Sequence, residues 1–201
     1  MNHTFVKLAQ LDEDGINRLA VLHHSVMQTL LSDLGLPVVS RYYQVARDDR
    51  SVVGICVVSS SGEMLGWALG SPHPDLINSR VRTPFMWFLF QMLRLTLTHP
   101  LVLWQLISYV LGSSGQPDMK SGAIELTYIG VASNQRNKGL GRELLNAFIE
   151  ASRSSGYHSV VLSVEMENTP AIALYERSGF KITQSFSEGR YKRHRMELVL
   201  A

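Results

Sequence analysis

The sequence is poor in the features that assign a protein to a special class. It has a single cysteine, Cys56, among 201 residues, so no disulfide can form within the chain. The formal net charge is only +2, too small for a broad nucleic-acid-binding surface. The first ten residues, MNHTFVKLAQ, lack the charged and apolar regions of a secretion signal. We therefore expect a cytoplasmic protein without a nucleic-acid partner.

Metal ligands and reactive nucleophiles are also scarce. Among the seven histidines, His23 and His24 are adjacent and the others are scattered, which matches no metal-ligand spacing. Cys56 lies in the run SVVGICVVS, which predicts a buried core thiol. No segment resembles the nucleophile elbow of hydrolases. We expect no metal, and any catalysis must use other side chains.

Apolar residues make up 45% of the chain, enough for a core, and their spacing predicts alternating strands and helices. We therefore expect one α/β domain over residues 1–201, built on a mixed sheet with flanking helices. The predicted strands are residues 4–9, 52–59, 64–70, 123–131, 158–165, 180–186 and 191–200. The predicted helices are residues 12–34, 38–48, 139–154 and 170–177.

A long apolar insertion, residues 71–122, separates the predicted 52–70 hairpin from the next strand and contains PFMWFLFQMLRLTLTHPLVLWQLISYVLG. Arg94, His99 and Pro100 interrupt this run, so two apolar helices are favoured over a transmembrane hairpin. We expect their apolar sides to be buried within the protein or in a homodimer, because exposure invites aggregation. Contact of residues 84–112 with a membrane surface is the competing interpretation. The insertion could also wall an acceptor site or receive a long acyl chain.

The stretch NQRNKGLGREL, residues 134–144, joins a predicted buried strand to a predicted helix. A helix start leaves backbone N–H groups unpaired, and Gly139 and Gly141 would let an anion approach them. The stretch lacks the complete dinucleotide and P-loop patterns, so we predict a site for a diphosphate of another kind. The alternative is a loop with solvated basic residues. Three cations stand where the helix dipole disfavours them: Arg136, Lys138 and Arg142.

A second informative stretch is ENTPAIALYERSGF, residues 167–180. Pro170 suits the first helical position, which makes Thr169 the expected cap and leaves the Asn168 side chain for a ligand. Tyr175 would then be held near the end of this helix. A core tyrosine is the alternative for Tyr175.

Together these two stretches resemble the GNAT superfamily of acyl-CoA-dependent N-acetyltransferases. The phosphate signature of that family, Arg or Gln, two residues, Gly, one residue, then Gly or Ala, matches Arg136, Gly139 and Gly141. The later signature of the family matches Asn168, Ala171, Leu174, Tyr175, Gly179 and Phe180. The resemblance is strong over residues 123–186, and it implies a V-splayed central sheet and acetyl-CoA as co-substrate.

The resemblance also assigns roles to residues. Tyr175 would be the general acid near the departing thiolate, and Glu125 would be the base, directly or through water. A structural ion pair or a bystander role is the alternative for Glu125, because a carboxylate in an apolar strand needs a partner. The implied cofactor-binding residues are Ile129, Gly130, Val131, Arg136, Asn137, Lys138, Gly139, Leu140, Gly141, Arg142 and Asn168.

The implied reaction is transfer of an acetyl group from acetyl-CoA to a primary amine by direct attack in a ternary complex. A small-molecule acceptor, such as an amino sugar or amino acid, is favoured over a protein amine. Three alternatives remain open: a longer acyl chain, a CoA-binding regulatory or scaffold module without catalysis, and a membrane-surface protein. The basic run RYKRHR, residues 190–195, is expected to keep a terminal edge strand solvated, with an acidic partner or the cofactor ribose phosphate as alternatives.

Overall fold

The computed structural model describes residues 3–83, 85–98, 119–188 and 191–200. The strands are β1 (His3–Lys7), β2 (Val53–Ser59), β3 (Met64–Ser71), β4 (Ala123–Val131), β5 (Ser159–Glu165), β6 (Lys181–Glu188) and β7 (Tyr191–Val199). The helices are α1 (Glu13–Val26), α2 (Leu30–Asp33), α3 (Leu36–Asp48), α4 (Pro74–Val81), α5 (Phe85–Thr98), α7 (Leu140–Ser154) and α8 (Thr169–Arg177). Two short 3-10 turns, η1 (Leu8–Gln10) and η2 (Ser133–Gln135), complete the set.

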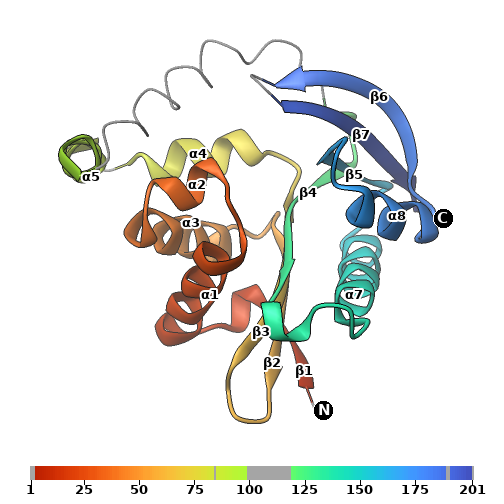
Figure 1. The fold of residues 1–201 in the computed structure, drawn as a ribbon, viewed down its shortest axis with the longest axis horizontal. Helices are drawn as coiled ribbons and strands as arrows, with labels where there is room; N and C mark the ends of the chain where they lie inside the picture. The colour runs from red at the N-terminus through yellow and green to blue at the C-terminus, as the bar shows by residue number, and fades with distance from the viewer. Residues whose placement is uncertain (1–2, 84, 99–118, 189–190, 201) are drawn as a thin grey trace.

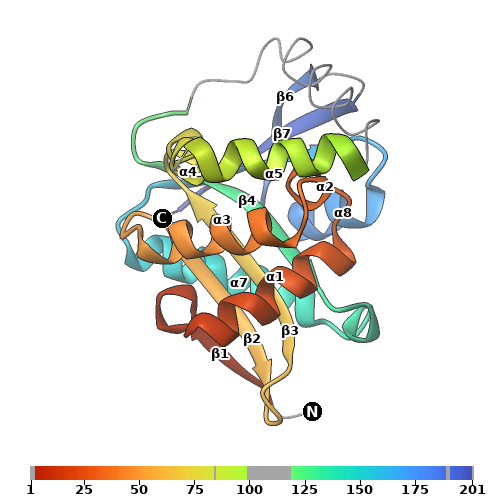
Figure 2. The same ribbon diagram turned by 90° about the vertical axis from the view of Figure 1, so that its left-hand side faces the viewer.

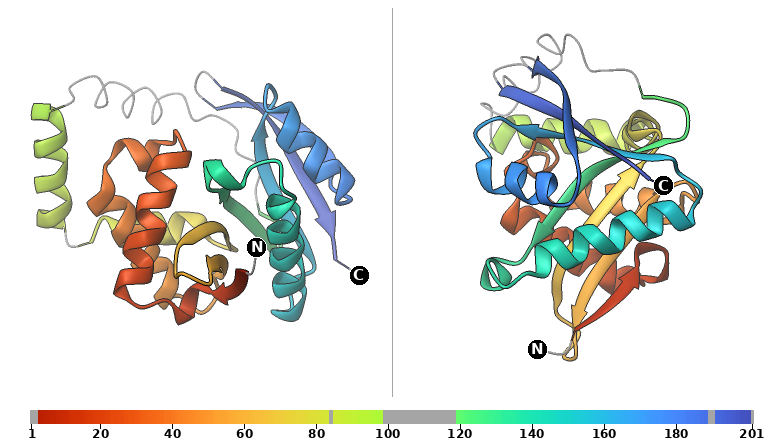
Figure 3. Two further views of the ribbon diagram at one scale, coloured as in Figure 1. Left: turned by 60° about the horizontal axis from the view of Figure 1, so that its bottom comes forward. Right: turned by 90° about the vertical axis from the view of Figure 1, so that its right-hand side faces the viewer.

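Within the described residues, seven strands form one mixed sheet in the order β1-β2-β3-β4-β5-β7-β6. Only β4 and β5 run parallel to each other, and the other neighbouring pairs are antiparallel. Helices α1 to α5 lie on one side of this sheet, and α7 and α8 lie on the other (Figure 1; Figure 3). The expected mixed α/β fold with flanking helices is confirmed.

Two apolar clusters hold the layers together. The first joins α7 and α8 to the sheet through Leu144, Phe148 and Tyr175, and the second joins α1 and α3 to the opposite side. Burying a large apolar side chain contributes roughly 1.5–3 kcal/mol, so these clusters supply most of the stability. Cys56 belongs to the second cluster and is 1% exposed, and burial raises the pKa of its thiol to about 12. The expectation of an unreactive core thiol is confirmed.

Strand β4 contains a bulge at Thr127. Leu69 of β3 pairs with Tyr128 and Gly70 pairs with Leu126, so Thr127 has no partner on β3. A bulge bends its strand and shifts the alternation of side chains. Beyond it, Ile129 and Val131 face the same cluster as Ile124 and Leu126, whereas Tyr128 faces the second cluster.

The pairing between β4 and β5 is short. It joins residues 123–125 to residues 159–161, after which β5 continues against β7 alone. The two parallel strands therefore diverge directly before the bulge, which gives the expected V-shaped opening at the centre of the sheet. A Cβ atom on Gly70 would lie 2.6 Å from the Glu125 carbonyl oxygen, so only glycine fits opposite this point.

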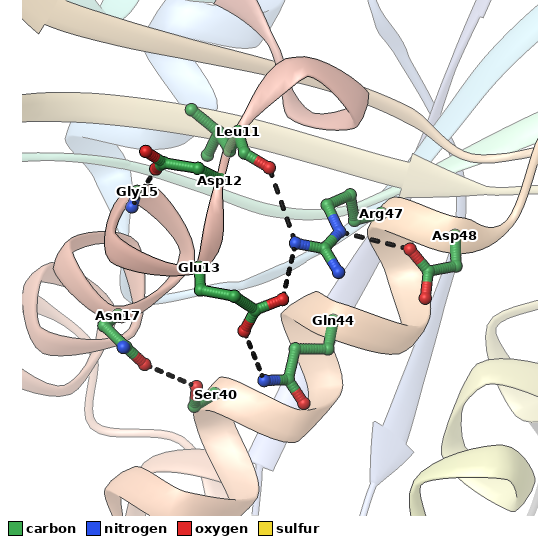
Figure 4. Close-up of polar contacts among 9 residues, drawn as sticks. All are labelled: Leu11, Asp12, Glu13, Gly15, Asn17, Ser40, Gln44, Arg47 and Asp48. Carbon is green, nitrogen blue, oxygen red and sulfur yellow. Dashed lines mark hydrogen bonds and ion pairs between the residues drawn. The ribbon is translucent and has the colours of Figure 1, made fainter.

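Polar contacts connect α1 to α3 (Figure 4). The Asp12 carboxylate caps α1 by accepting a hydrogen bond from Gly15 N at 2.7 Å. Glu13 accepts a hydrogen bond from Gln44 at 3.0 Å and pairs with Arg47 at 2.9 Å. Exposed pairs of this kind contribute about 1 kcal/mol or less, so they orient α3 more than they stabilise it.

The predicted helix over residues 12–34 is divided, and in this respect the prediction is wrong. Helix α1 ends at Val26, Met27 is extended, and α2 begins at Leu30. The Ser32 hydroxyl donates a hydrogen bond to the Met27 carbonyl at 2.7 Å, which satisfies a group freed by the break.

The apolar insertion follows β3 as expected. Of the predicted burial within the protein or in a homodimer, the described residues do not provide the first for α5, and the second stays a prediction. Five of the apolar side chains that the structure describes on α5 are between 47% and 73% exposed, whereas Trp87 packs against the second cluster. The second predicted apolar helix, beyond Pro100, lies outside the described residues. In the part of the chain that the structure describes, no helix is both long and apolar enough to cross a membrane.

The interpretation of RYKRHR as part of a solvated edge strand is also wrong. Strand β7 pairs with β5 on one side and with β6 on the other, so it lies inside the sheet. Arg195 is only 6% exposed. A buried guanidinium needs a partner, and that partner is part of the candidate site.

Candidate active site

The loop before α7 turns through two left-handed residues. Asn137 has φ +61° and Gly139 has φ +87°, and Gly139 is the N-cap of the helix. Left-handed residues beside right-handed ones turn successive N–H groups toward one concave side, which suits an anion. The GLG pattern therefore has a structural reason, because Gly139 adopts a conformation that side chains disfavour.

The backbone N–H groups of residues 137–141 have no hydrogen-bond partner among the described residues. The first N–H groups bonded in this region belong to Arg142 and Glu143, and both donate to Gly139 O at 3.0 and 3.2 Å. A Cβ atom on Gly141 would meet nothing within 4 Å. A row of free donors therefore stands at a helix start with open space beside Gly141, which suits the binding of a diphosphate.

The three basic side chains of the loop are exposed. Arg136, Lys138 and Arg142 make no ion pair with any residue that the structure describes. They are thus available to pair with an anion at the helix start.

The end of β4 offers backbone groups next to this loop. Ile129, Gly130 and Val131 pair with β3 on one side. On the β5 side, the described residues provide no strand partner beyond Glu125. An extended ligand can therefore contact this edge of β4 as an additional strand would.

Asn168 caps α8, and Thr169 is its first residue, so the predicted Thr169 cap is wrong. The Asn168 side-chain oxygen accepts a hydrogen bond from Ala171 N at 3.3 Å. Its amide N–H groups remain for a ligand.

Tyr175 lies on α8 in the first apolar cluster, on the same side of the sheet as α7. Its side chain is 7% exposed, and its ring lies 5.8 Å from the ring of Phe180. Burial raises the pKa of Tyr175 to about 12, so the hydroxyl stays protonated at neutral pH.

Glu125 is held by Arg195. The two carboxylate oxygens accept hydrogen bonds from the guanidinium at 2.8 and 3.2 Å, and Arg195 also donates to Ser163 Oγ at 3.0 Å. This group connects β4, β5 and β7 at the point where β4 and β5 diverge. Sequence reasoning missed Arg195 because it lies 70 residues from Glu125 and appeared to belong to a solvated run.

A second cluster of buried polar side chains surrounds His23 of α1. His23 is fully buried, with Nδ1 2.6 Å from the Tyr43 hydroxyl and Nε2 3.2 Å from Thr29 Oγ1. Its ring lies 4.9 Å from the ring of Tyr128 on β4. Sequence reasoning placed no role on His23, although its spacing from Leu19 put it on the buried side of α1.

The described residues contain no group of three or more histidine, cysteine, aspartate or glutamate side chains that could hold a metal ion.

We predict that His23 makes stability depend on pH. Burial, with a smaller contribution from the charge of His24, lowers the pKa of His23 from 6.5 to about 4. The unfolded chain therefore takes up a proton between these values and the folded chain does not, so stability is full above pH 6.5 and falls toward pH 4. The loss is about 3 kcal/mol, measured as the free energy of unfolding in urea at several pH values.

The control for this prediction is a pair of variants. His23→Gln should remove the pH dependence in this window, whereas His24→Gln, at an exposed position, should keep most of it. Equal slopes in the two variants would show that His23 is not the titrating group.

Comparison with known proteins agrees with this geometry. Residues 22–180 match the model of the acetyltransferase (GNAT) family. A spermidine N-acetyltransferase from Vibrio cholerae has a similar fold, with a TM-score of 0.60, 15% sequence identity, and coverage of 98% of this chain and 93% of that one. At such low identity the likeness concerns the fold alone.

Two curated relatives share shorter regions. Mycothiol acetyltransferase of Corynebacterium glutamicum is 39% identical over 61 residues, which are 30% of this chain and 21% of the relative. The L-methionine sulfoximine/L-methionine sulfone acetyltransferase of Pseudomonas aeruginosa is 45% identical over 53 residues, 26% of this chain and 31% of the relative. The chain thus matches about a fifth to a third of the length of these relatives. Because the family model spans most of the chain and the fold agrees, the chain belongs to the GNAT family of acetyltransferases.

Proposed function

We propose that the chain is an N-acetyltransferase that moves the acetyl group of acetyl-CoA to a primary amine by direct attack in a ternary complex. The observation that carries the proposal is the row of unpaired N–H groups at residues 137–141, which faces open space at Gly141. Acetyl-CoA has a diphosphate for this row and an extended pantetheine arm for the free edge of β4.

The residues present fit that cofactor. The N–H groups of residues 137–141 and the side chains of Arg136, Lys138 and Arg142 would hold the phosphates. The backbone of residues 129–131 would hold the arm, and the Asn168 amide would add a donor. Acetyl-CoA supplies the acetyl group as a thioester, and the chain supplies orientation and proton donors.

Tyr175 is proposed to stabilise the departing sulfur. A phenol, with a reference pKa of about 10, is a weaker acid than a thiol, with about 8.5, so full proton transfer from Tyr175 to the thiolate is uphill. Tyr175 therefore acts as a hydrogen-bond donor to the developing thiolate, and the proton that the thiolate finally takes comes from the amine that loses it.

Glu125 has two competing roles, the base that accepts the amine proton and a brace that fixes the sheet. Both of its oxygens already accept hydrogen bonds from Arg195, which favours the brace. With Glu125 engaged, water is proposed to accept the amine proton and to pass a proton to the thiolate.

We propose a small-molecule amine as the acceptor. The similar proteins are named for mycothiol, for methionine sulfoximine and sulfone, and for spermidine, all of which are small. Thiol release from acetyl-CoA with a pooled library of small amines tests this proposal. Background release would favour a CoA-binding module without catalysis, and release only with longer acyl-CoAs would favour a different acyl donor.

One prediction concerns the unpaired backbone N–H groups of residues 137–141. Acetyl-CoA should raise the unfolding temperature of the wild type, because a ligand bound only by the folded state stabilises it. Gly141→Val should remove this shift while leaving the unliganded unfolding temperature nearly unchanged, since its Cβ meets no protein atom within 4 Å. Asn146→Val, exposed on the same helix, is the matched control and should keep the shift. A full shift in Gly141→Val would contradict the assignment.

A further prediction concerns the role of Tyr175 in turnover. Tyr175→Phe should lower kcat by roughly tenfold to a thousandfold and leave the KM for acetyl-CoA little changed, because only stabilisation of the leaving sulfur is lost. Steady-state thiol release measures both constants. An unchanged kcat would leave Tyr175 as a core residue.

Another prediction distinguishes the two possible roles of Glu125, a brace of the sheet and the base. If Glu125 is a brace, Glu125→Gln should cost about 3 kcal/mol of stability, because the buried Arg195 loses its partner. The pH profile of kcat should then keep its acidic limb. The double variant with Arg195→Gln should cost less than the sum of the two single variants. A stable Glu125→Gln variant that loses activity and the acidic limb would instead identify Glu125 as the base.

A further inference from the structure

Helix α5 has an apolar face that the rest of the described chain leaves uncovered. Its side chains are spaced one, three and four residues apart in the sequence, which places them on one side of the helix. The members, called here the α5 face, are Phe85, Met86, Leu89, Phe90 and Leu93, with exposed fractions of 69%, 73%, 47%, 62% and 58%. Trp87 packs against the second cluster and attaches the helix to the body of the protein.

Helix α5 also lies at the outside of the part of the molecule that the structure describes. Figure 1 shows α5 farther from the sheet than α1, α3 and α4, and Figure 2 shows it lying across the helices on this side. A broad surface can therefore reach α5 before it reaches the sheet or α7.

Two cations lie beside the start of α5. Arg41 of α3 donates a hydrogen bond to the Thr83 carbonyl at 3.3 Å. Arg80 pairs with Asp49 at 2.7 Å, whereas Arg82 is exposed at the end of α4 and close in sequence to the α5 face. An apolar helix side next to basic residues is the pattern of a helix that lies in the interface of an anionic membrane.

We propose that the α5 face binds the surface of an anionic lipid membrane, with the apolar side chains at the acyl boundary and Arg82 at the headgroups. A second copy of the chain is the competing occupant of this face, and the experiment below distinguishes the two. This proposal is independent of the acetyltransferase reaction and requires neither acetyl-CoA nor an amine.

Flotation with lipid vesicles tests the proposal. The wild type should float with vesicles of phosphatidylcholine and phosphatidylserine and should float less with phosphatidylcholine alone or at high salt. The double variant Leu89→Glu/Phe90→Glu should bind at least tenfold more weakly, because it places two charges in the acyl boundary. The matched control is Ile182→Glu/Val199→Glu, which adds two charges at exposed apolar positions on β6 and β7 and should float like the wild type.

Arg82→Gln should weaken binding to anionic vesicles about fivefold and leave binding to phosphatidylcholine unchanged. Three results would overturn the proposal. The wild type could fail to float with either vesicle, or the α5 face variant could float like the wild type. Light scattering could also show a dimer that the α5 face variant converts to a monomer, which would assign the face to a second copy.

Discussion

The extra residue in β4, Thr127, determines how the two halves of the sheet are used. Without it, Ile129 and Val131 would turn away from α7 and Tyr128 would turn toward it, because a shift of one residue exchanges the faces of a strand. The bulge lies just beyond the last residue of β4 that pairs with β5. One local irregularity therefore lets α7 pack on apolar side chains and leaves the edge of β4 free for a ligand.

Opening a sheet at its centre leaves backbone groups without partners, and such groups are costly to bury. The pair of Glu125 and Arg195, with Ser163, joins the three strands at this opening. A buried ion pair adds little net stability compared with apolar side chains, but its geometry is specific. We infer that its contribution is to fix the angle at which β4 leaves β5, which a purely apolar contact would define less sharply.

The features that the sequence predicted correctly are local. The bounds of β4 and the helix start after Gly139 follow from side-chain period and from glycine, which act within a few residues. The contact of Arg195 with Glu125 was missed because it joins residues that are 70 positions apart in the sequence. The break at Met27 was missed because residues 26–32 contain neither glycine nor proline. The Asn168 cap was missed because Asn and Thr both cap helices well. The sequence showed that the insertion is apolar, but burial also requires a partner surface, which an apolar run does not specify.

Helix α5 and the loop of residues 136–142 lie on opposite sides of the sheet, which matters if both bind at the same time. Acetyl-CoA is an anion, and an anionic lipid surface repels it within about 8 Å at physiological ionic strength. Helix α5 lies on the side of the sheet that carries α1 and α3, whereas the loop leads into α7 on the opposite side (Figure 3). A protein that contacts lipid through the α5 face would therefore keep residues 136–142 toward water. The same sheet that divides the two apolar clusters would then also separate the lipid surface from the cofactor, so membrane contact and cofactor binding can occur together.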